Sequence, residues 1–319
     1  MGLLDLPISN FVAVRAAILD IGTNTVLLLI AERENGGIRV VTDRHAIARL
    51  GEGVDRARKI SDAAYERLIG VLREHQRVIA EYTCDRVVAV ATSAMRDADN
   101  SQEIIQRTKA DTGIAVELLS GGEEARWTYR GAIDGMPLEG PIRVVDIGGG
   151  STEISTGTDQ IFERGTSFDI GAVRLTERCF ATSPITMEAR EAARKLVRHM
   201  LEHDVERASA EDAPKNLVAV AGTPTTLAAM HQELTVFDAA KVHGYVLRRQ
   251  AVDQMLEIVF SVSTATLLER FPAVNKARAD ILPAGTLILA EVMEYLGAEQ
   301  VTVSTQGLRY GIALRELFV

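Results

Sequence analysis

The sequence predicts an α/β protein built from two similar domains that face each other across a cleft. Residues 14–25 and residues 142–152 each run as an apolar strand into Asp-Ile-Gly. In both segments a second extended run and a Gly-containing turn come next, whereas the dinucleotide fold and the P-loop place a helix directly after their glycines. A strand, a tight turn and a strand that occur twice indicate two related domains, each giving one loop to the cleft.

The segment that follows the first repeat alternates helix and strand. Residues 61–83 carry apolar side chains on one helical face behind Ser61, a capping residue, and therefore predict an amphipathic helix. Residues 86–91 predict a buried strand. Residues 101–112 predict a second helix, which Gly113 ends.

The elements further along the chain have weaker signals. Residues 114–118 predict a short strand, and Ser120 and Glu123 have the spacing of a capping box for the helix that follows. The remaining expected elements are a helix at 187–207, a strand at 217–221, a mainly helical segment at 248–296, a strand at 301–304 and a helix at 307–317.

Composition excludes several classes of protein. The chain has 319 residues, of which 47% are hydrophobic, so it can bury a core large enough for two domains. Its formal charge of −9 argues against a protein that coats nucleic acid, because that affinity depends on Lys and Arg. Charged residues interrupt both long apolar stretches, so we expect no membrane span. With no secretory signal pattern and only two cysteines, Cys84 and Cys179, we expect a cytoplasmic protein with reduced thiols.

Two Gly-containing loops follow the repeated strands and are candidate phosphate sites. In the first, Gly22 lets the backbone approach an anion and residues 23–25 offer polar donors, although a plain hairpin turn explains this loop equally well. The second loop, residues 146–153, has three successive glycines, whose entropic cost of roughly 0.5–1 kcal/mol each favours close approach of a ligand. Asp20 and Asp146 end the two strands, where a hard divalent cation could bind through carboxylate and water.

Two acidic residues, Glu123 and Glu124, lie in the first turn of the helix that Ser120 caps. Both would complement the helix dipole, and the residues alone favour this structural role. The alternative is that one glutamate projects into the cleft as a general base, for a water that attacks a terminal phosphorus.

Two further strand ends carry polar residues. Ser93 and Arg96 follow the strand at 86–91, where Arg96 is either a phosphate clamp or an ordinary surface arginine. Residues 222–226 offer either a third N–H cradle or a capped helix start. His199 and His203 are four positions apart but lack the glutamate of a zinc-protease motif.

Several motifs taken together resemble the exopolyphosphatase and guanosine pentaphosphate phosphohydrolase (Ppx/GppA) family in order and spacing, over nearly the whole chain. They begin at Asp20 (Asp-Ile-Gly-Thr-Asn-Thr), Ala91 (Ala-Thr-Ser-Ala-Met-Arg), Leu119 (Leu-Ser-Gly-Gly-Glu-Glu-Ala), Asp146 (Asp-Ile-Gly-Gly-Gly-Ser-Thr-Glu), Gly171 (Gly-Ala-Val-Arg-Leu-Thr), Ala221 (Ala-Gly-Thr-Pro-Thr-Thr), Arg278 (Arg-Ala-Asp-Ile-Leu-Pro-Ala-Gly) and Gly307 (Gly-Leu-Arg-Tyr-Gly). The resemblance implies two ribonuclease H-like domains of the actin-like and sugar-kinase-like ATPase group, which agrees with the duplicated hairpins.

The resemblance also implies roles for single residues. The family's catalytic glutamate falls on Glu124, which implies a general base there. Asp20, Asp146 and Glu153 match acidic loop positions, which implies that they hold magnesium, or manganese in its place, or position water. The implied phosphate ligands are Gly22, Thr23, Asn24, Thr25, Ser93, Arg96, Gly148, Gly149, Gly150, Ser151, Thr152, Gly222 and Thr223.

The length of the chain resembles the short, two-domain members of the family, because longer members carry an extra helical region that lengthens the substrate channel. The implied substrate is therefore short-chain inorganic polyphosphate. In such folds the terminal helix packs on the first domain, so we expect one domain from residues 1–125 plus about 300–319, and a second from 126–299, with a cleft that closes on substrate. We expect a homodimer, since closed dimers are the commonest assemblies.

Three other functions compete with exopolyphosphatase activity. Hydrolysis of guanosine pentaphosphate (pppGpp) uses the same phosphoanhydride chemistry, and the sequence leaves it open. A kinase of the related superfamily would pass phosphate to an acceptor instead of water, and Glu124 argues against it. A phosphate or nucleotide sensor without turnover would fit better had Glu124 or Asp146 been replaced.

Overall fold

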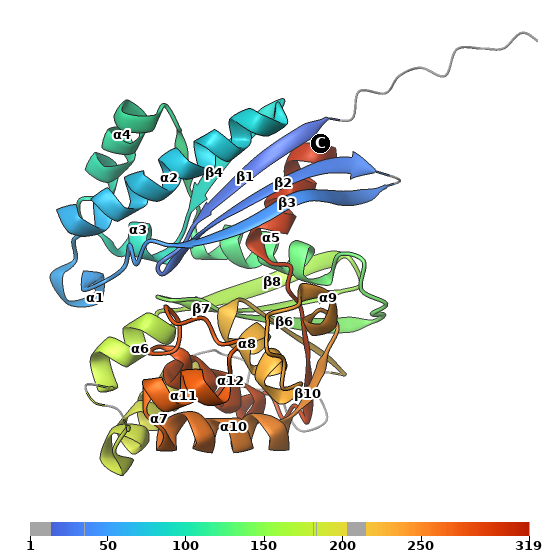
Figure 1. Cartoon of the computed structure of the whole chain (residues 1–319). Helices are drawn as coiled ribbons and strands as arrows, with labels where there is room; N and C mark the ends of the chain where they lie inside the picture. Colours follow the sequence, from blue (N-terminus) through green and yellow to red (C-terminus); the bar gives the residue numbers. More distant parts are fainter. Residues whose placement is uncertain (1–13, 35, 181, 183, 203–214, 319) are drawn as a thin grey trace, which may run out of the picture.

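The computed structural model describes residues 14–34, 36–180, 182, 184–202 and 215–318, and these residues form two mixed β-sheets with helices around them (Figure 1). The first sheet has the strand order β3-β2-β1-β4-β5, and the second has the order β10-β11-β9-β6-β7-β8. The strands are β1 (Arg15–Ile21), β2 (Thr25–Glu34), β3 (Gly37–Ile47), β4 (Arg86–Ala91), β5 (Val116–Leu118), β6 (Pro141–Ile147), β7 (Thr152–Thr158), β8 (Ile161–Phe168), β9 (Asn216–Val220), β10 (Val246–Arg248) and β11 (Gln300–Val303).

The two sheets repeat one topology. β1 and β6 each pair antiparallel with the strand that follows them, β2 or β7, and parallel with a later strand, β4 or β9. β3 and β8 then extend the hairpins in the antiparallel sense, and β5 and β11 extend the other side in the parallel sense. This duplication confirms the predicted α/β fold class.

Helices separate and flank the sheets. They are α1 (Val54–Ala57), α2 (Asp62–Tyr82), α3 (Ser93–Asp97), α4 (Ser101–Thr112), α5 (Gly121–Ile133), α6 (Ala172–Cys179), α7 (Met187–Glu202), α8 (Gly222–His231), α9 (Ala239–Val242), α10 (Arg249–Ser261), α11 (Thr264–Arg270), α12 (Leu282–Tyr295) and α13 (Leu308–Phe318). Among the described residues, no helix is both long and apolar enough to cross a membrane.

Local capping chemistry sets several helix ends where the sequence predicts them. The Ala64 N–H donates to the Ser61 hydroxyl at 3.2 Å, which starts α2. Ser120 and Glu123 form the reciprocal capping box of α5, and Gly113, at φ 75°, ends α4 in the left-handed conformation. The predicted helix at 187–207 is described as α7, and its positions 203–207 lie outside the described residues. Cys84 and Cys179 are not joined by a disulfide.

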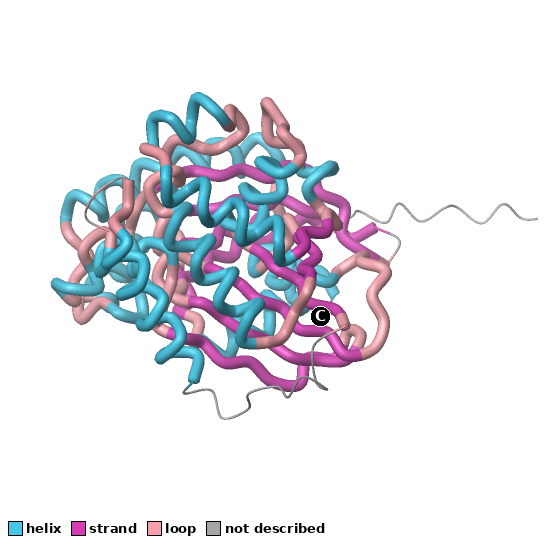
Figure 2. Tube along the Cα trace, turned by 90° about the horizontal axis from the view of Figure 1, so that it is seen from below, coloured by secondary structure: helices cyan, strands magenta, loops and turns pink. Residues whose placement is uncertain are grey.

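Four clusters of buried apolar side chains pack the helices against the two sheets. α2 and α4 cover one face of the first sheet and α13 covers the other, so α13 and α5 lie between the two sheets (Figure 1). α5 packs on β7 and β8 of the second sheet. Seen from below, helices stand in front of the strands of the second sheet, on the face turned away from the first sheet (Figure 2). The largest core cluster lies between these helices and that face.

The chain crosses between the two sheets near residue 304. Residues 300–303, expected with the first domain, form β11 and pair with β9 and β10 in the second sheet. Val301 and Val303 are fully buried there, which explains why this segment belongs to the second core. Beyond the crossing, α13 packs on β1 and β2 of the first sheet.

Two glycines allow the backbones of α5 and α13 to touch. A Cβ on Gly311 would lie 1.8 Å from the Trp127 carbonyl oxygen, and one on Gly131 would lie 2.2 Å from the Gly307 carbonyl oxygen. We expect Gly311→Ala to lower the free energy of unfolding by about 3 kcal/mol, because backbone atoms cannot move aside as a side chain can. Urea denaturation measures this change.

The matched control for that prediction is Gly70→Ala. Gly70 is exposed in α2 and has open space where its Cβ would be. Alanine there should raise the free energy of unfolding by about 0.5–1 kcal/mol, since glycine loses more entropy in a helix. Similar shifts in the two variants would contradict the close contact between α5 and α13.

Candidate active site

A cavity of about 780 Å³ lies between the two sheets and is lined from both. Its walls come from the segments that follow β1, β4, β6, β9 and β11, at the carboxyl ends of the parallel strands. Ligands of α/β proteins bind at this end of the sheet. The cavity is therefore the candidate active site.

Most of the residues predicted from the sequence meet in this cavity. The first loop, the second loop, the end of β4, the start of α5 and the start of α8 all contribute. The predicted residues on its wall are Asp20, Gly22, Thr23, Asn24, Thr25, Ser93, Glu124, Asp146, Gly148, Gly149, Gly150, Ser151, Gly222 and Thr223.

Three predicted residues, Thr152, Glu153 and Arg96, do not line the cavity. Thr152 is fully buried, and its hydroxyl donates to the Ile170 carbonyl at 2.6 Å. This hydroxyl ties β7 to the segment before α6, which corrects the prediction that Thr152 binds phosphate. Glu153, at 1% exposure, accepts a hydrogen bond from the Ser167 hydroxyl at 2.6 Å, and its Oε2 has no partner among the described residues.

Arg96 binds carboxylates of the protein itself. Its Nη1 donates to Glu124 Oε2 at 2.5 Å and to the Leu119 carbonyl at 3.2 Å, and its Nη2 lies 3.9 Å from Glu153 Oε1. The guanidinium thus links two glutamates behind the cavity wall. These contacts indicate that Arg96 holds Glu124 in place, where the sequence predicted a cation that binds the substrate.

Buried carboxylates give the cavity excess negative charge. Burial, and next the charge of Glu124, raises the pKa of Asp20 and of Asp146 to about 7. Burial also raises the pKa of Glu124, against the opposing charge of Arg96, and it raises the pKa of Glu153 well above its usual value. Protons or a cation must offset this charge.

The carboxylate oxygens suit a hard cation such as Mg²⁺. Among the described residues, no three acidic, histidine or cysteine side chains converge as a complete ligand set. Mg²⁺ commonly binds through one or two carboxylates and otherwise uses water and phosphate oxygens. Asp20 and Asp146, which line the cavity with raised pKa values, fit that mode of binding.

The second loop turns three carbonyl groups toward α6. The Gly148 oxygen accepts from the Ala172 N–H at 2.9 Å, the Gly149 oxygen from the Val173 N–H at 2.8 Å, and the Gly150 oxygen from a side chain of α6 at 2.7 Å.

The carbonyl contacts fix the direction of the neighbouring amides. In a trans peptide the N–H of the next residue points opposite to the carbonyl, so the N–H groups of Gly149, Gly150 and Ser151 point away from α6. Within the described part of the chain none of the three has a hydrogen-bond acceptor. Successive free N–H groups on a cavity wall form a nest for an anion.

Arg278 is a cavity residue that the sequence reasoning quoted in a motif but did not assign to the site. Its Nη2 donates to the Thr25 hydroxyl at 3.3 Å, and within the described residues it has no carboxylate partner. Burial, and next the nearby Arg309, lowers the pKa of Arg278. By contrast, Asp43 binds Arg309 through both carboxylate oxygens. Arg278 is therefore available to bind an anion.

Arg278 packs against Gly222, a predicted phosphate ligand that also lines the cavity. A Cβ at Gly222 would lie 1.5 Å from Arg278 Nη1, so a larger residue would displace the guanidinium from this position. Gly222 thus admits the arginine side chain to the cavity wall. In the sequence, only the resemblance of the motif at Arg278 to the family could have indicated Arg278 as a site residue, since an isolated arginine gives no sign of whether it binds a ligand.

The cavity combines three N–H groups without acceptors, an arginine without a carboxylate partner among the described residues, and the carboxylates of Asp20, Glu124 and Asp146. Comparison with known proteins places the chain in a family. The model of the Ppx/GppA phosphatase family matches residues 29–318. The chain belongs to the Ppx/GppA phosphatase family. This confirms the resemblance seen in the motifs.

Relatives within the Ppx/GppA family match over almost their whole length. Exopolyphosphatase 2 of Mycobacterium tuberculosis is 36% identical over 316 residues, which cover 94% of this chain and 98% of the relative. The crystal structure of the Aquifex aeolicus Ppx/GppA family member has a TM-score of 0.81 and 31% identity, and covers 96% of this chain and 98% of that one. An exopolyphosphatase from Cytophaga hutchinsonii has a TM-score of 0.87 and 27% identity, with 95% and 98% covered.

Proposed function

We propose that this Ppx/GppA phosphatase is an exopolyphosphatase, which hydrolyses the terminal phosphoanhydride of short inorganic polyphosphate chains and releases orthophosphate. The observation that carries the proposal is Glu124, a buried carboxylate on the cavity wall that Arg96 holds by one oxygen. The names of the relatives from Mycobacterium tuberculosis and Cytophaga hutchinsonii support the substrate.

The terminal phosphate would bind between the second loop and Arg278. The free N–H groups of Gly149, Gly150 and Ser151 would donate to its oxygens, and the Arg278 guanidinium would balance part of its charge. The backbone and hydroxyl groups of residues 22–25 would receive the next phosphate. This arrangement leaves the terminal phosphorus beside the carboxylates.

Glu124 would act as the general base. Burial raises the pKa of the Glu124 carboxyl above its ordinary value, which makes the carboxylate a stronger base. It would take a proton from water as the water oxygen attacks the terminal phosphorus, and the bond from that phosphorus to the bridging oxygen would break. The products are orthophosphate and a chain shorter by one phosphate. Arg96 would keep Glu124 aimed at the water.

Asp20 and Asp146 would hold Mg²⁺, or Mn²⁺ in its place, with Glu153 behind them to position water. When bound, the metal ion neutralises charge on the phosphate oxygens. The unpartnered Oε2 of Glu153 supports a polar occupant near this residue, because a buried oxygen without a partner is costly.

The proposed division into two domains follows the sheets, with the correction that β11 belongs to the second. Direct contacts join the two sides: Arg49 Nη2 lies 2.9 Å from Asp280 Oδ2, and the Gly53 N–H donates to Glu177 Oε1 at 3.0 Å. We propose that these contacts form when the domains close on substrate. A cytoplasmic homodimer remains part of the proposal.

A second candidate substrate is pppGpp, which an apolar part of the cavity favours. Val236, Phe237, Pro272, Ala273 and Val274 line this part, and a polyphosphate chain has no apolar group to place there. The volume of about 780 Å³ also lies within the range of pockets that enclose an organic ligand. A purine base would bury apolar surface against these side chains.

Phosphate release separates the candidates. Purified protein with Mg²⁺ is given short polyphosphate, long polyphosphate, pppGpp and ATP in parallel, at equal concentrations of terminal phosphate. We expect the highest kcat/KM with short polyphosphate. A higher value with pppGpp would favour the second candidate. Binding of these anions with no release from any would mean a sensor without turnover.

Arg278→Gln should raise KM for the preferred substrate about tenfold or more, with a smaller change in kcat. The variant loses a charge-assisted hydrogen bond to the substrate, which is worth about 1.5–3 kcal/mol. The matched control is Arg86→Gln, since the Arg86 side chain is 48% exposed and pairs with Glu316 outside the cavity. Initial rates over a range of substrate concentrations measure both variants, and equal KM values would contradict the role of Arg278.

A further inference from the structure

We propose that Arg174 is a positioning residue that couples closure of the two halves to the orientation of the phosphate nest. This inference rests on the proposed function and assigns a role to a residue that does not line the main cavity. Arg174 lies on α6, is 6% exposed, and belongs to the half of the molecule that contains the second sheet.

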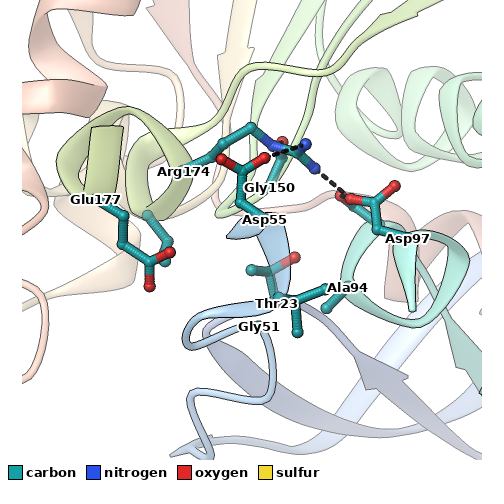
Figure 3. Close-up of a pocket in the computed structure, with 11 residues that line it drawn as sticks. Thr23, Gly51, Asp55, Ala94, Asp97, Gly150, Arg174 and Glu177 are labelled. Atoms are coloured by element: carbon teal, nitrogen blue, oxygen red, sulfur yellow. Dashed lines mark hydrogen bonds and ion pairs between the residues drawn. The ribbon is translucent and has the colours of Figure 1, made fainter. Parts of the chain in front are cut away.

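Each end of the Arg174 guanidinium holds a different partner. Its Nε donates to the Gly150 carbonyl at 2.7 Å. Its Nη1 donates to Asp55 Oδ1 at 2.9 Å, and its Nη2 donates to Asp97 Oδ2. Figure 3 shows the guanidinium between the two carboxylates, with Gly150 behind it. One side chain thus binds the second loop and two acidic residues at once.

The bond to Gly150 sets the last amide of the nest. Backbone amides of α6 hold the carbonyls of Gly148 and Gly149, whereas a side chain alone holds the carbonyl of Gly150. If Arg174 released that carbonyl, the peptide between Gly150 and Ser151 could rotate. The Ser151 N–H would then no longer be fixed toward the cavity.

The two acidic partners belong to the other half of the molecule. Asp55 lies on α1 and Asp97 on α3, which connect elements of the first sheet. Asp97 Oδ2 also accepts from the Ser93 hydroxyl at 3.3 Å, and Ser93 lines the active-site cavity. A small pocket behind the phosphate loops is lined by all of these groups and by Thr23.

The Arg174 side chain therefore links the approach of the two halves to the geometry of the phosphate nest. When the halves approach, Asp55 and Asp97 fix the orientation of the Arg174 guanidinium, which then holds the Gly150 carbonyl in place. Separation of the halves would free the guanidinium, and the Ser151 N–H of the nest would lose its fixed direction. A planar fork with donors in fixed directions is required for this, and lysine cannot supply it.

The experiment compares Arg174→Lys and Arg174→Ala with Arg178→Ala. Arg178 also binds Asp55, at 2.7 Å, but among the described residues no hydrogen bond joins it to the second loop. With Mg²⁺ and short polyphosphate, we expect both Arg174 variants to lose about 10²-fold in kcat/KM, as for a misplaced catalytic group, and Arg178→Ala to lose less than threefold. Added guanidinium ion should restore part of the kcat of Arg174→Ala.

Three results would overturn the proposal. They are wild-type kcat/KM in Arg174→Lys, an equal loss in Arg178→Ala, and no rescue by guanidinium in an Arg174→Ala protein with a wild-type melting temperature. If wild type releases no phosphate from any substrate, the proposed function fails separately. Pyrophosphate binding by calorimetry then tests Arg174: weaker binding in its variants alone supports the nest role, and unchanged binding contradicts it.

Discussion

Glu124→Gln is expected to lower kcat for phosphate release about 10³-fold or more, while KM changes only a few-fold. Glutamine keeps the shape of the side chain and an oxygen for the Arg96 hydrogen bond, but it cannot accept a proton from water. General base catalysis typically contributes 10²- to 10⁴-fold, and the buried position of Glu124 supports the upper part of that range. A continuous phosphate assay with the preferred substrate measures the loss.

The neighbouring glutamate offers a matched control. Glu123 is exposed, and its Oε2 accepts from the Ser120 N–H at 2.9 Å as part of the capping box. Glu123→Gln should leave kcat within about twofold and lower the free energy of unfolding by about 1 kcal/mol at most, as for a weakened cap. Turnover by Glu124→Gln at the wild-type rate would rule out the proposed general base.

Asp146→Asn is expected to lower phosphate release by about 10²- to 10³-fold and, in the absence of metal, to stabilise the protein. The loss follows because the variant removes a carboxylate from the proposed cation site, and one lost electrostatic contact at the transition state has an effect of this size. The gain in stability follows because burial, and next the charges of Glu124 and Asp20, raises the pKa of Asp146 to about 7, so its charged form is costly in the native protein.

The pH dependence of stability has a definite sign. Asp146 has a pKa of 3.8 when unfolded and of about 7 in the native protein, so its contribution to stability is fully present below about pH 4. Between about pH 4 and 7 the unfolded chain loses the proton first, and this contribution is lost as the pH rises.

Thermal unfolding without metal, at a series of pH values, tests this sign. The advantage of Asp146→Asn over wild type should grow from pH 5 to pH 8, and Mg²⁺ should stabilise wild type more than the variant. A constant difference between the two proteins across this range would contradict a native pKa near 7 for Asp146.

The fold could be predicted largely because its signals are local. The Ser61 cap, the capping box at Ser120 and the left-handed Gly113 each act within four residues, and the structure has all three. The repeated Asp-Ile-Gly hairpins predicted two related sheets. The crossing after β11 was placed a few residues too early, since a short apolar strand has no local signal for the sheet that it joins.

The site could be predicted only in part, because its decisive contacts join distant segments. Sequence left two roles open for Glu123 and Glu124, and the helix separates them: Glu123 turns back to Ser120 and Glu124 lines the cavity. The Arg96 contact with Glu124 and the Arg278 contact with Thr25 depend on packing between elements far apart in the chain. No spacing rule indicates such pairs.

The position of α13 has a consequence for the order of folding. This eleven-residue helix covers one face of the first sheet, where Ile18 and Leu29 are fully buried together with Ile312. These partners are nearly 300 positions apart, and contacts at such separation are slow to form. During synthesis the N-terminal half must therefore wait with one apolar face uncovered until residues 308–318 have left the ribosome.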